Sequence, residues 1–243
     1  MGNVKRKRIE IRRRRRMKVT YISHSGFLIE MERANFLFDY FKGEIPKMER
    51  EKPLYVFSSH SHHDHFNSVI FDLSKKYNNV TYILSSDIQS PKGLNCYTMS
   101  PYEERQIKDI KIKTFKSTDL GVAFLIEAEK KTVYHAGDLH WWHWIGEPDE
   151  DNLWMEKAYK HELELLKGRH MDVAFLVLDP RQEAAFDMGM DSFLRAVDVD
   201  IVFPMHCWDD YSVISSYKNS QKGEEFREKI MDITKEGETF YIE

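Results

Sequence analysis

The chain reads Ser59-His60-Ser61-His62-His63-Asp64-His65 between two contrasting segments. The apolar run Leu54-Tyr55-Val56-Phe57 precedes it and predicts a buried strand, and a helical pattern over 66–77 follows it. Four imidazoles and one carboxylate are therefore expected on a loop between a strand and a helix. These ligand types suit a borderline divalent ion such as zinc, so the loop predicts a metal site.

The spacing within this loop suggests how the ligands divide. In an extended chain the side chains at i and i+2 point the same way, so His60 and His62 are expected to share one ion. Asp64 and His65 lie beyond a bend and can face a second ion. The alternative is a solvated, histidine-rich turn that collects metal non-specifically. The preceding strand, the following helix and the acid at this offset together disfavour it.

The pattern His60-x-His62-x-Asp64-His65 after a strand resembles the signature of the metallo-β-lactamase superfamily of hydrolases. The resemblance covers residues 17–243, most like the small single-domain members, which include an ascorbate-phosphate lactonase-like branch. With the order of predicted strands and helices, it implies an α/β fold. We expect two mixed β-sheets packed face to face with helices outside, a four-layer αββα sandwich.

The resemblance also implies ligands further along the chain. Gly137-Asp138 closes a strand over 131–135, where the family places a carboxylate that bridges two metals. His206 ends a strand over 200–206, where the family has its last ligand. The implied metal ligands are thus His60, His62, Asp64, His65, Asp138 and His206.

One family ligand is missing. The family commonly has Gly-His-Thr-x-Gly where this chain reads Ser117-Thr118-Asp119-Leu120-Gly121, and no histidine occurs between Phe66 and Tyr134. Asp119 is the nearest substitute, and His135 or His140 could also supply the ligand. His140 lies in His140-Trp141-Trp142-His143-Trp144, which predicts either a pocket wall or a packed loop.

Two earlier residues have open roles. Asp39 ends a strand over 35–40, where the resemblance implies a brace for the metal loop, although a simple turn residue fits equally. His24 follows the first strand, where some family members place a histidine at the mouth of the site. A purely structural histidine is the alternative.

The charge distribution bears on partners and domains. Residues 1–16 contain nine Lys or Arg and one Glu, a net charge of +8, and the whole chain carries −4, so residues 17–243 carry −12. We expect 17–243 to form a single domain. Residues 1–16 read as a disordered basic tail or a mis-assigned start. An acidic body repels phosphate, so no nucleic-acid partner is expected for residues 17–243.

The composition also predicts where in the cell the protein is found. There are two cysteines and no CxxC, which favours a reducing cytoplasm. The basic first segment has no apolar core and so is not a secretory signal. No run of about 20 apolar residues occurs, so no membrane association is expected. The sequence leaves the oligomeric state open.

The expected function is metal-dependent hydrolysis. Zinc is the expected cofactor, as one or two ions, with manganese or iron as alternatives. A metal-bound hydroxide would attack an ester, lactone or phosphodiester of a small molecule, and Asp64 would orient the water and shuttle its proton. A non-catalytic metal-binding or sensing protein on the same fold is the first alternative. A nuclease or RNA-processing enzyme is the second.

Overall fold

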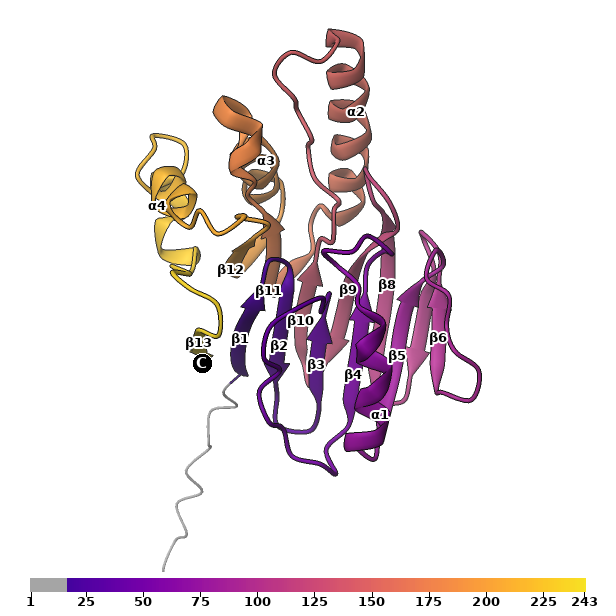
Figure 1. Ribbon diagram of the computed structural model, residues 1–243. Helices are drawn as coiled ribbons and strands as arrows, with labels where there is room; N and C mark the ends of the chain where they lie inside the picture. Colours follow the sequence, from indigo (N-terminus) through magenta and orange to yellow (C-terminus); the bar gives the residue numbers. More distant parts are fainter. Residues whose placement is uncertain (1–16) are drawn as a thin grey trace, which may run out of the picture.

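The computed structural model describes residues 17–243 as two mixed β-sheets with helices outside them (Figure 1). The expectations for residues 1–16 lie outside the described part. The first sheet has the order β13-β1-β2-β3-β4-β5-β6 and the second the order β12-β11-β10-β9-β8-β7. The strands of the first sheet are β1 (Met17–Ser23), β2 (Gly26–Glu30), β3 (Asn35–Phe38), β4 (Leu54–Ser58), β5 (Val80–Ser85), β6 (Cys96–Met99) and β13 (Thr239–Ile242). Those of the second are β7 (Glu104–Ile107), β8 (Ile110–Lys116), β9 (Val122–Ala128), β10 (Lys131–His135), β11 (His170–Val177) and β12 (Asp198–Met205).

The helices confirm the expected α/β class. They are η1 (Ser68–Asp72), α1 (Leu73–Lys76), α2 (Asp149–Leu166), η2 (Pro180–Ala185), α3 (Met188–Ala196), α4 (Ser212–Lys218) and η3 (Glu224–Lys229). In Figure 1, α1 lies in front of the first sheet, whereas α2 and α3 belong to the part of the chain that forms the second sheet. The stacked rings of Tyr134 in β10 and Phe193 in α3, 5.3 Å apart, attach α3 to the second sheet.

The alternation of side chains along the first sheet explains the layers. Phe36 and Phe38 pack in the main core, whereas Leu37 between them packs in a separate core with Ile70 and Leu73 beneath η1 and α1. Successive side chains of a strand point to opposite faces, so each face needs its own cover. Ring contacts between Phe27 and Phe175 and between Phe57 and Phe124, at 4.4 and 5.2 Å, join the two sheets.

Three predicted elements differ from the structure. The sequence favours one half-buried strand over 107–115, but the strand β8 begins only at Ile110, because the chain turns at Lys108, whose φ is 51°, and Ile107 ends the paired strand β7. The helix predicted over 66–77 is mostly 3-10, with α-helix only in its last turn.

The sequence also favours a closing helix over 222–235, and this prediction is wrong, whereas α4 was not predicted. Only 224–229 is helical, as a 3-10 segment. Ile230 is extended, and the Met231 N–H donates to the Val202 carbonyl at 2.9 Å. Pairing with β12 therefore overrides the helical spacing of the apolar residues in this segment.

Two glycines of the second sheet allow it to approach the loop of residues 59–65, which we call the metal loop. A Cβ on Gly121, whose φ is +75°, would lie 2.0 Å from the Ser59 carbonyl oxygen. A Cβ on Gly137, whose φ is +52°, would lie 2.6 Å from Ser59 Cβ. The Val122 N–H donates to the Ser59 carbonyl at 2.9 Å, so the sheets are hydrogen-bonded at this contact. Only glycine permits this approach, which brings Asp138 to the histidines.

Gly121→Ala should therefore destabilise the fold more than a matched change elsewhere. Gly93 also has a positive φ, +85°, but a Cβ there meets nothing within 4 Å. We expect Gly93→Ala to cost about 1 kcal/mol for the left-handed backbone. Gly121→Ala should cost about 2 kcal/mol more because its Cβ overlaps backbone. Urea unfolding of metal-free protein measures both, and equal losses would contradict this account.

Candidate metal centre

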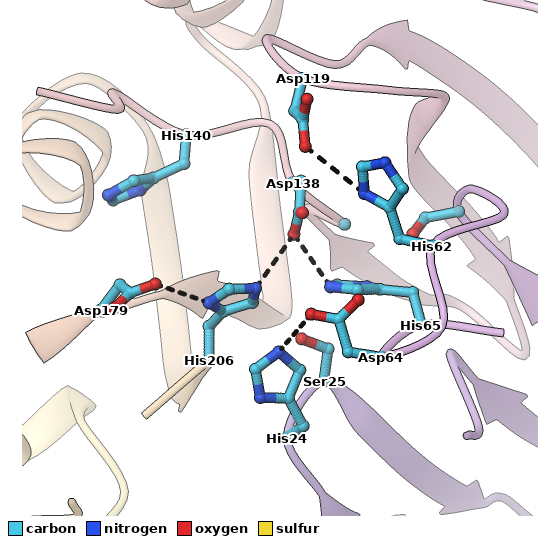
Figure 2. Close-up of polar contacts among 12 residues, drawn as sticks. His24, Ser25, His62, Asp64, His65, Asp119, Asp138, His140, Asp179 and His206 are labelled. Carbon is cyan, nitrogen blue, oxygen red and sulfur yellow. Dashed lines mark hydrogen bonds and ion pairs between the residues drawn. The ribbon is translucent and has the colours of Figure 1, made fainter. Parts of the chain in front are cut away.

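Side chains from both sheets converge above the strand ends as two groups of ligand atoms (Figure 2). The atoms within each group lie within 4.8 Å of one another. The first group is His60, His62, Asp119 and Asp138, and the second is His24, Asp64, His65 and His206. All six residues that the sequence predicted as metal ligands are in these groups, together with His24 and Asp119.

Asp138 lies between the two groups. Its Oδ1 is 3.1 Å from His65 Nε2 and 3.6 Å from His206 Nε2. Its Oδ2 is 3.4 Å from His60 Nε2. One oxygen thus faces the second group and the other faces the first, the arrangement that a carboxylate shared by two cations requires.

The polar atoms at the centre fit a metal better than they fit one another. Five buried atoms have no hydrogen-bond partner within residues 17–243: Nε2 of His24, His60, His65 and His206, and Oδ1 of Asp138. Buried polar atoms are rarely left without a partner, because desolvation costs about 1–3 kcal/mol for each. Two ligands at about 2.0–2.1 Å from a tetrahedral zinc lie about 3.3–3.4 Å apart. The 3.1–3.6 Å separations around Asp138 match that spacing.

Asp39 lies beneath the loop of residues 59–65 and holds it, the first of the two roles that the sequence left open. This fully buried carboxylate accepts hydrogen bonds from the Ser59 N–H at 2.7 Å and the Ser59 hydroxyl at 2.6 Å. It also accepts one from His65 Nδ1 at 2.8 Å. With Nδ1 engaged, Nε2 of His65 is fixed toward Asp138, as is usual for a metal-binding histidine.

Asp179 orients His206 in the same way. Its Oδ2 accepts a hydrogen bond from His206 Nδ1 at 2.8 Å, which leaves Nε2 directed at Asp138 (Figure 2). The sequence analysis missed this residue. The available signal was the Asp179-Pro180 pair, directly after the apolar run over 173–178.

The electrostatics of the two groups favour bound cations. Burial lowers the pKa of His24 and of His60 to about 4, so both are neutral and able to bind metal near pH 7. Burial opposes ionisation of Asp138, but His65 and His206 outweigh it and hold its pKa well below the usual range. Burial and the charge of Asp138 raise the pKa of Asp119. Asp64, Asp119 and Asp138 thus lie close together, and a bound cation would stabilise their negative charges.

The backbone is strained at the site. His24, Asp39 and His206 have φ values of 54°, 39° and 68°. Each such residue costs on the order of 1 kcal/mol or more, so surrounding contacts must impose the conformation. The Tyr21 hydroxyl accepts a hydrogen bond from the His24 N–H at 2.8 Å, and the His24 carbonyl accepts one from the His206 N–H at 3.3 Å.

The structure does not bring His135 or His140 into either group. His135 Nε2 donates to the Ser25 carbonyl at 3.0 Å, and its Nδ1 accepts the Gly137 N–H. His140 points away from Asp138 and contacts Gln182 Oε1 at 2.7 Å (Figure 2). Thr118, at the place of the missing histidine, bonds to the backbone around Asp138. Its neighbour Asp119 reaches the first group, with Oδ2 3.6 Å from His62 Nδ1.

A cavity of about 490 Å³ opens onto both groups. Trp142 and Trp144 line it, so the tryptophan-rich segment does contribute a wall. Trp208 and Arg181 line it as well, and neither was predicted. Trp141 is buried, with the Lys160 ammonium 4.8 Å from its ring centroid.

A third cluster of metal-ligand types lies at the start of β11 and β12. His170, Asp172 and Asp200 form it, and none of them is buried. Lys131 pairs with Asp172 at 2.6 Å, and His170 Nδ1 is 2.8 Å from Asp198. These partners account for the cluster without an ion.

Comparison with known proteins identifies the family of the chain. A family model described as a β-lactamase superfamily domain matches residues 18–149, more than half of the chain. The chain belongs to the β-lactamase superfamily. A metal-dependent hydrolase from Nanoarchaeum equitans is 25% identical over 226 residues, which cover 86% of this chain and 93% of that protein.

Two solved structures share the fold. A metallo hydrolase from Ignicoccus hospitalis superposes with a TM-score of 0.65 at 16% identity, over 94% of this chain and 99% of that one. The metallo-β-lactamase fold protein YhfI from Bacillus subtilis superposes with a TM-score of 0.60 at 15% identity, over 92% and 99%. The predicted fold class is confirmed.

The chain is therefore a metal-dependent hydrolase of this superfamily. Among the described residues, no helix is both long enough and apolar enough to span a membrane.

Asp39→Asn should weaken metal binding about 10- to 100-fold, the usual effect of removing the partner of a metal-binding histidine. The substitution removes the charge that holds His65 and Ser59. Asp87→Asn is the control, because the exposed Asp87 also accepts a loop N–H, from Ser61 at 2.7 Å, but touches no ligand. Competition against a zinc-binding dye measures both affinities, and equal losses would show that Asp39 has no special role.

Proposed function

We propose that this protein is a zinc-dependent hydrolase that cleaves an ester, lactone or phosphodiester bond in a small molecule. The observation that carries the proposal is the convergence of five unpaired, buried ligand atoms beside one open cavity. A metal site that only stabilises a fold is closed, whereas a catalytic one keeps a position open to solvent. The cavity supplies that opening here.

The two groups divide the ligands between two ions. His60, His62, Asp119 and Asp138 would hold the first ion, with Asp119 in place of the missing histidine. Asp64, His65, His206 and Asp138 would hold the second, and His24 is placed to complete its shell, with Nε2 3.5 Å from Asp64 Oδ2. The high share of imidazole favours zinc, whereas the shared carboxylates would also accept manganese or iron.

Zinc bound here would lower the pKa of a water to about 7 and so supply a hydroxide nucleophile. Asp64 is placed to orient that water and to carry its proton to the leaving group, since its carboxylate is partly open to the cavity. The indoles of Trp142 and Trp144 would exclude bulk water around the reacting bond. The charge of −12 on residues 17–243 disfavours nucleic acid as the substrate.

Replacing His60 and His62 together by Ala should remove at least one zinc equivalent and abolish hydrolysis. Purified wild-type protein should retain about two zinc equivalents and cleave para-nitrophenyl acetate or bis-para-nitrophenyl phosphate. The double variant should lose at least one equivalent and all turnover, because two ligands of one ion are gone.

His63→Ala is the matched control, because His63 lies in the same loop, its side chain is 92% exposed, and it is in neither group. It should keep its zinc, although it borders the cavity beside Asp64. A double variant that retains zinc and turnover would place the site elsewhere. Wild-type protein that holds zinc but cleaves no ester, lactone or phosphodiester would support the non-catalytic, metal-sensing alternative.

A further inference from the structure

One cationic side chain, Arg181, borders the cavity without belonging to either ligand group. Arg181, in η2, lines the cavity, and its side chain remains 47% exposed. Its guanidinium lies 4.3 Å from the Trp208 ring centroid and 5.8 Å from that of Trp144. Stacking between guanidinium and indole orients the plane of the group and leaves its polar edge available.

Only part of that edge is used within the protein. Nε and Nη2 of Arg181 donate to the Asp179 carboxylate at 2.6–3.0 Å. Within residues 17–243, Nη1 has no hydrogen-bond acceptor, and it lies on a side chain that borders the cavity. A planar guanidinium with an open donor edge suits a carboxylate or phosphate oxygen.

The rest of the cavity wall has a different character. Trp142 and Trp144 stack with their ring centroids 5.9 Å apart and their planes 8° apart, and Met155 adds a thioether. Such a wall binds the apolar body of a ligand, and a few placed polar groups fix its orientation. The metal groups, the aromatic wall and Arg181 thus offer three kinds of contact within one cavity.

We propose that Arg181 forms an anion subsite, and that the substrate is a small ester or phosphoester carrying a carboxylate or phosphate besides the bond that is cleaved. This inference rests on the proposed function and specifies its substrate class. Arg181 would contact the charged end, the tryptophans the apolar body, and the two ligand groups the scissile bond. Since residues 17–243 are strongly acidic overall, attraction of an anion must come from local cations such as this one.

A purely structural role for Arg181 makes a different prediction. Arg181 holds Asp179, and Asp179 orients His206, so a support role would appear as lost metal. An anion subsite would instead appear as lost affinity for charged ligands while the metal content stays unchanged. Zinc content is therefore measured first for every variant.

The binding test uses zinc-loaded protein and three probes with the same phenyl body: phenylacetate, phenylphosphonate and neutral phenylacetamide. Calorimetry should show Arg181→Gln weakening at least one anion about 10-fold or more, the usual loss for a hydrogen bond to a charged group, with phenylacetamide unchanged. Loss for phenylacetate alone identifies a carboxylate, loss for phenylphosphonate alone identifies a phosphate, and loss for both identifies a general anion site. Unchanged affinity for both anions at full zinc content overturns the proposal.

Arg195→Gln is the matched control. Its side chain is also 47% exposed, it pairs with a carboxylate, Asp191, and it lies 5.3 Å from the Phe226 ring centroid. It does not line the cavity, so it should change no affinity. If Arg181→Gln loses zinc as purified, it is compared with wild-type protein at saturating zinc. An unchanged preference for the anions over phenylacetamide under those conditions overturns the proposal.

A hydrolysis test separates this inference from the proposed function. Mono-para-nitrophenyl succinate and its methyl ester have the same para-nitrophenol leaving group, whose release is followed, and the methyl ester replaces the charged carboxylate by a neutral group. Arg181→Gln should lower kcat/KM for the charged ester about 10-fold relative to the neutral one, mainly through KM. Cleavage of both esters with an unchanged ratio would refute the anion subsite and leave the hydrolase standing. If neither ester is cleaved, the binding test still decides on Arg181.

Discussion

The carboxylate of Asp138 is the point on which the site depends. It is buried and ionised, with one oxygen toward His60 and the other toward His65 and His206. An isolated buried charge of this kind is costly, and the imidazoles around it keep their Nε2 atoms unpaired within the described residues. Two divalent cations would satisfy both sides at once. The preference of this arrangement for metal follows from its unsatisfied polar atoms.

Several features of the fold hold this arrangement in place, although buried charge and unpaired polar atoms destabilise it. Gly121 and Gly137 let the second sheet approach Ser59 closely enough to bring Asp138 to the loop. His24, Asp39 and His206 hold left-handed backbone conformations that the surrounding hydrogen bonds impose. Asp39 and Asp179 then fix the direction of two imidazoles from opposite sides of the site. Stability is thus given up locally for a preorganised ligand set, and the two large cores compensate for it.

Most of the fold and of the metal loop could be predicted from the sequence, because their signals are local. The strand before His60, the spacing to His65 and the Gly137-Asp138 turn each lie within a few residues of one another. The prediction for the end of the chain failed because its structure depends on distant contacts. Residues 230 and 231 pair with β12, and no local pattern reveals that pairing.

The positions of Asp119, our proposed substitute for the missing histidine, and of the cavity wall also depend on contacts between distant parts of the chain. Asp119 could be named as a candidate, but only the folded chain separates it from His135 and His140. Both of those rings bond to other partners and lie in neither ligand group. Arg181 and Trp208 gave no recognisable signal, since their position depends on where the ends of β11 and β12 meet. The acceptor for His206 was visible only as an Asp-Pro pair after an apolar strand.

We expect Asp138 to be shared between two ions, one in each ligand group. An anomalous difference map at the zinc edge, from crystals of zinc-loaded protein, would locate these ions. Sharing by Asp138 requires two peaks about 3.5–4 Å apart, with an Asp138 oxygen bound to each and Asp119 on the ion of His60 and His62. A single peak, two peaks without Asp138 between them, or a peak only at His170, Asp172 and Asp200 would show that Asp138 is not a shared ligand.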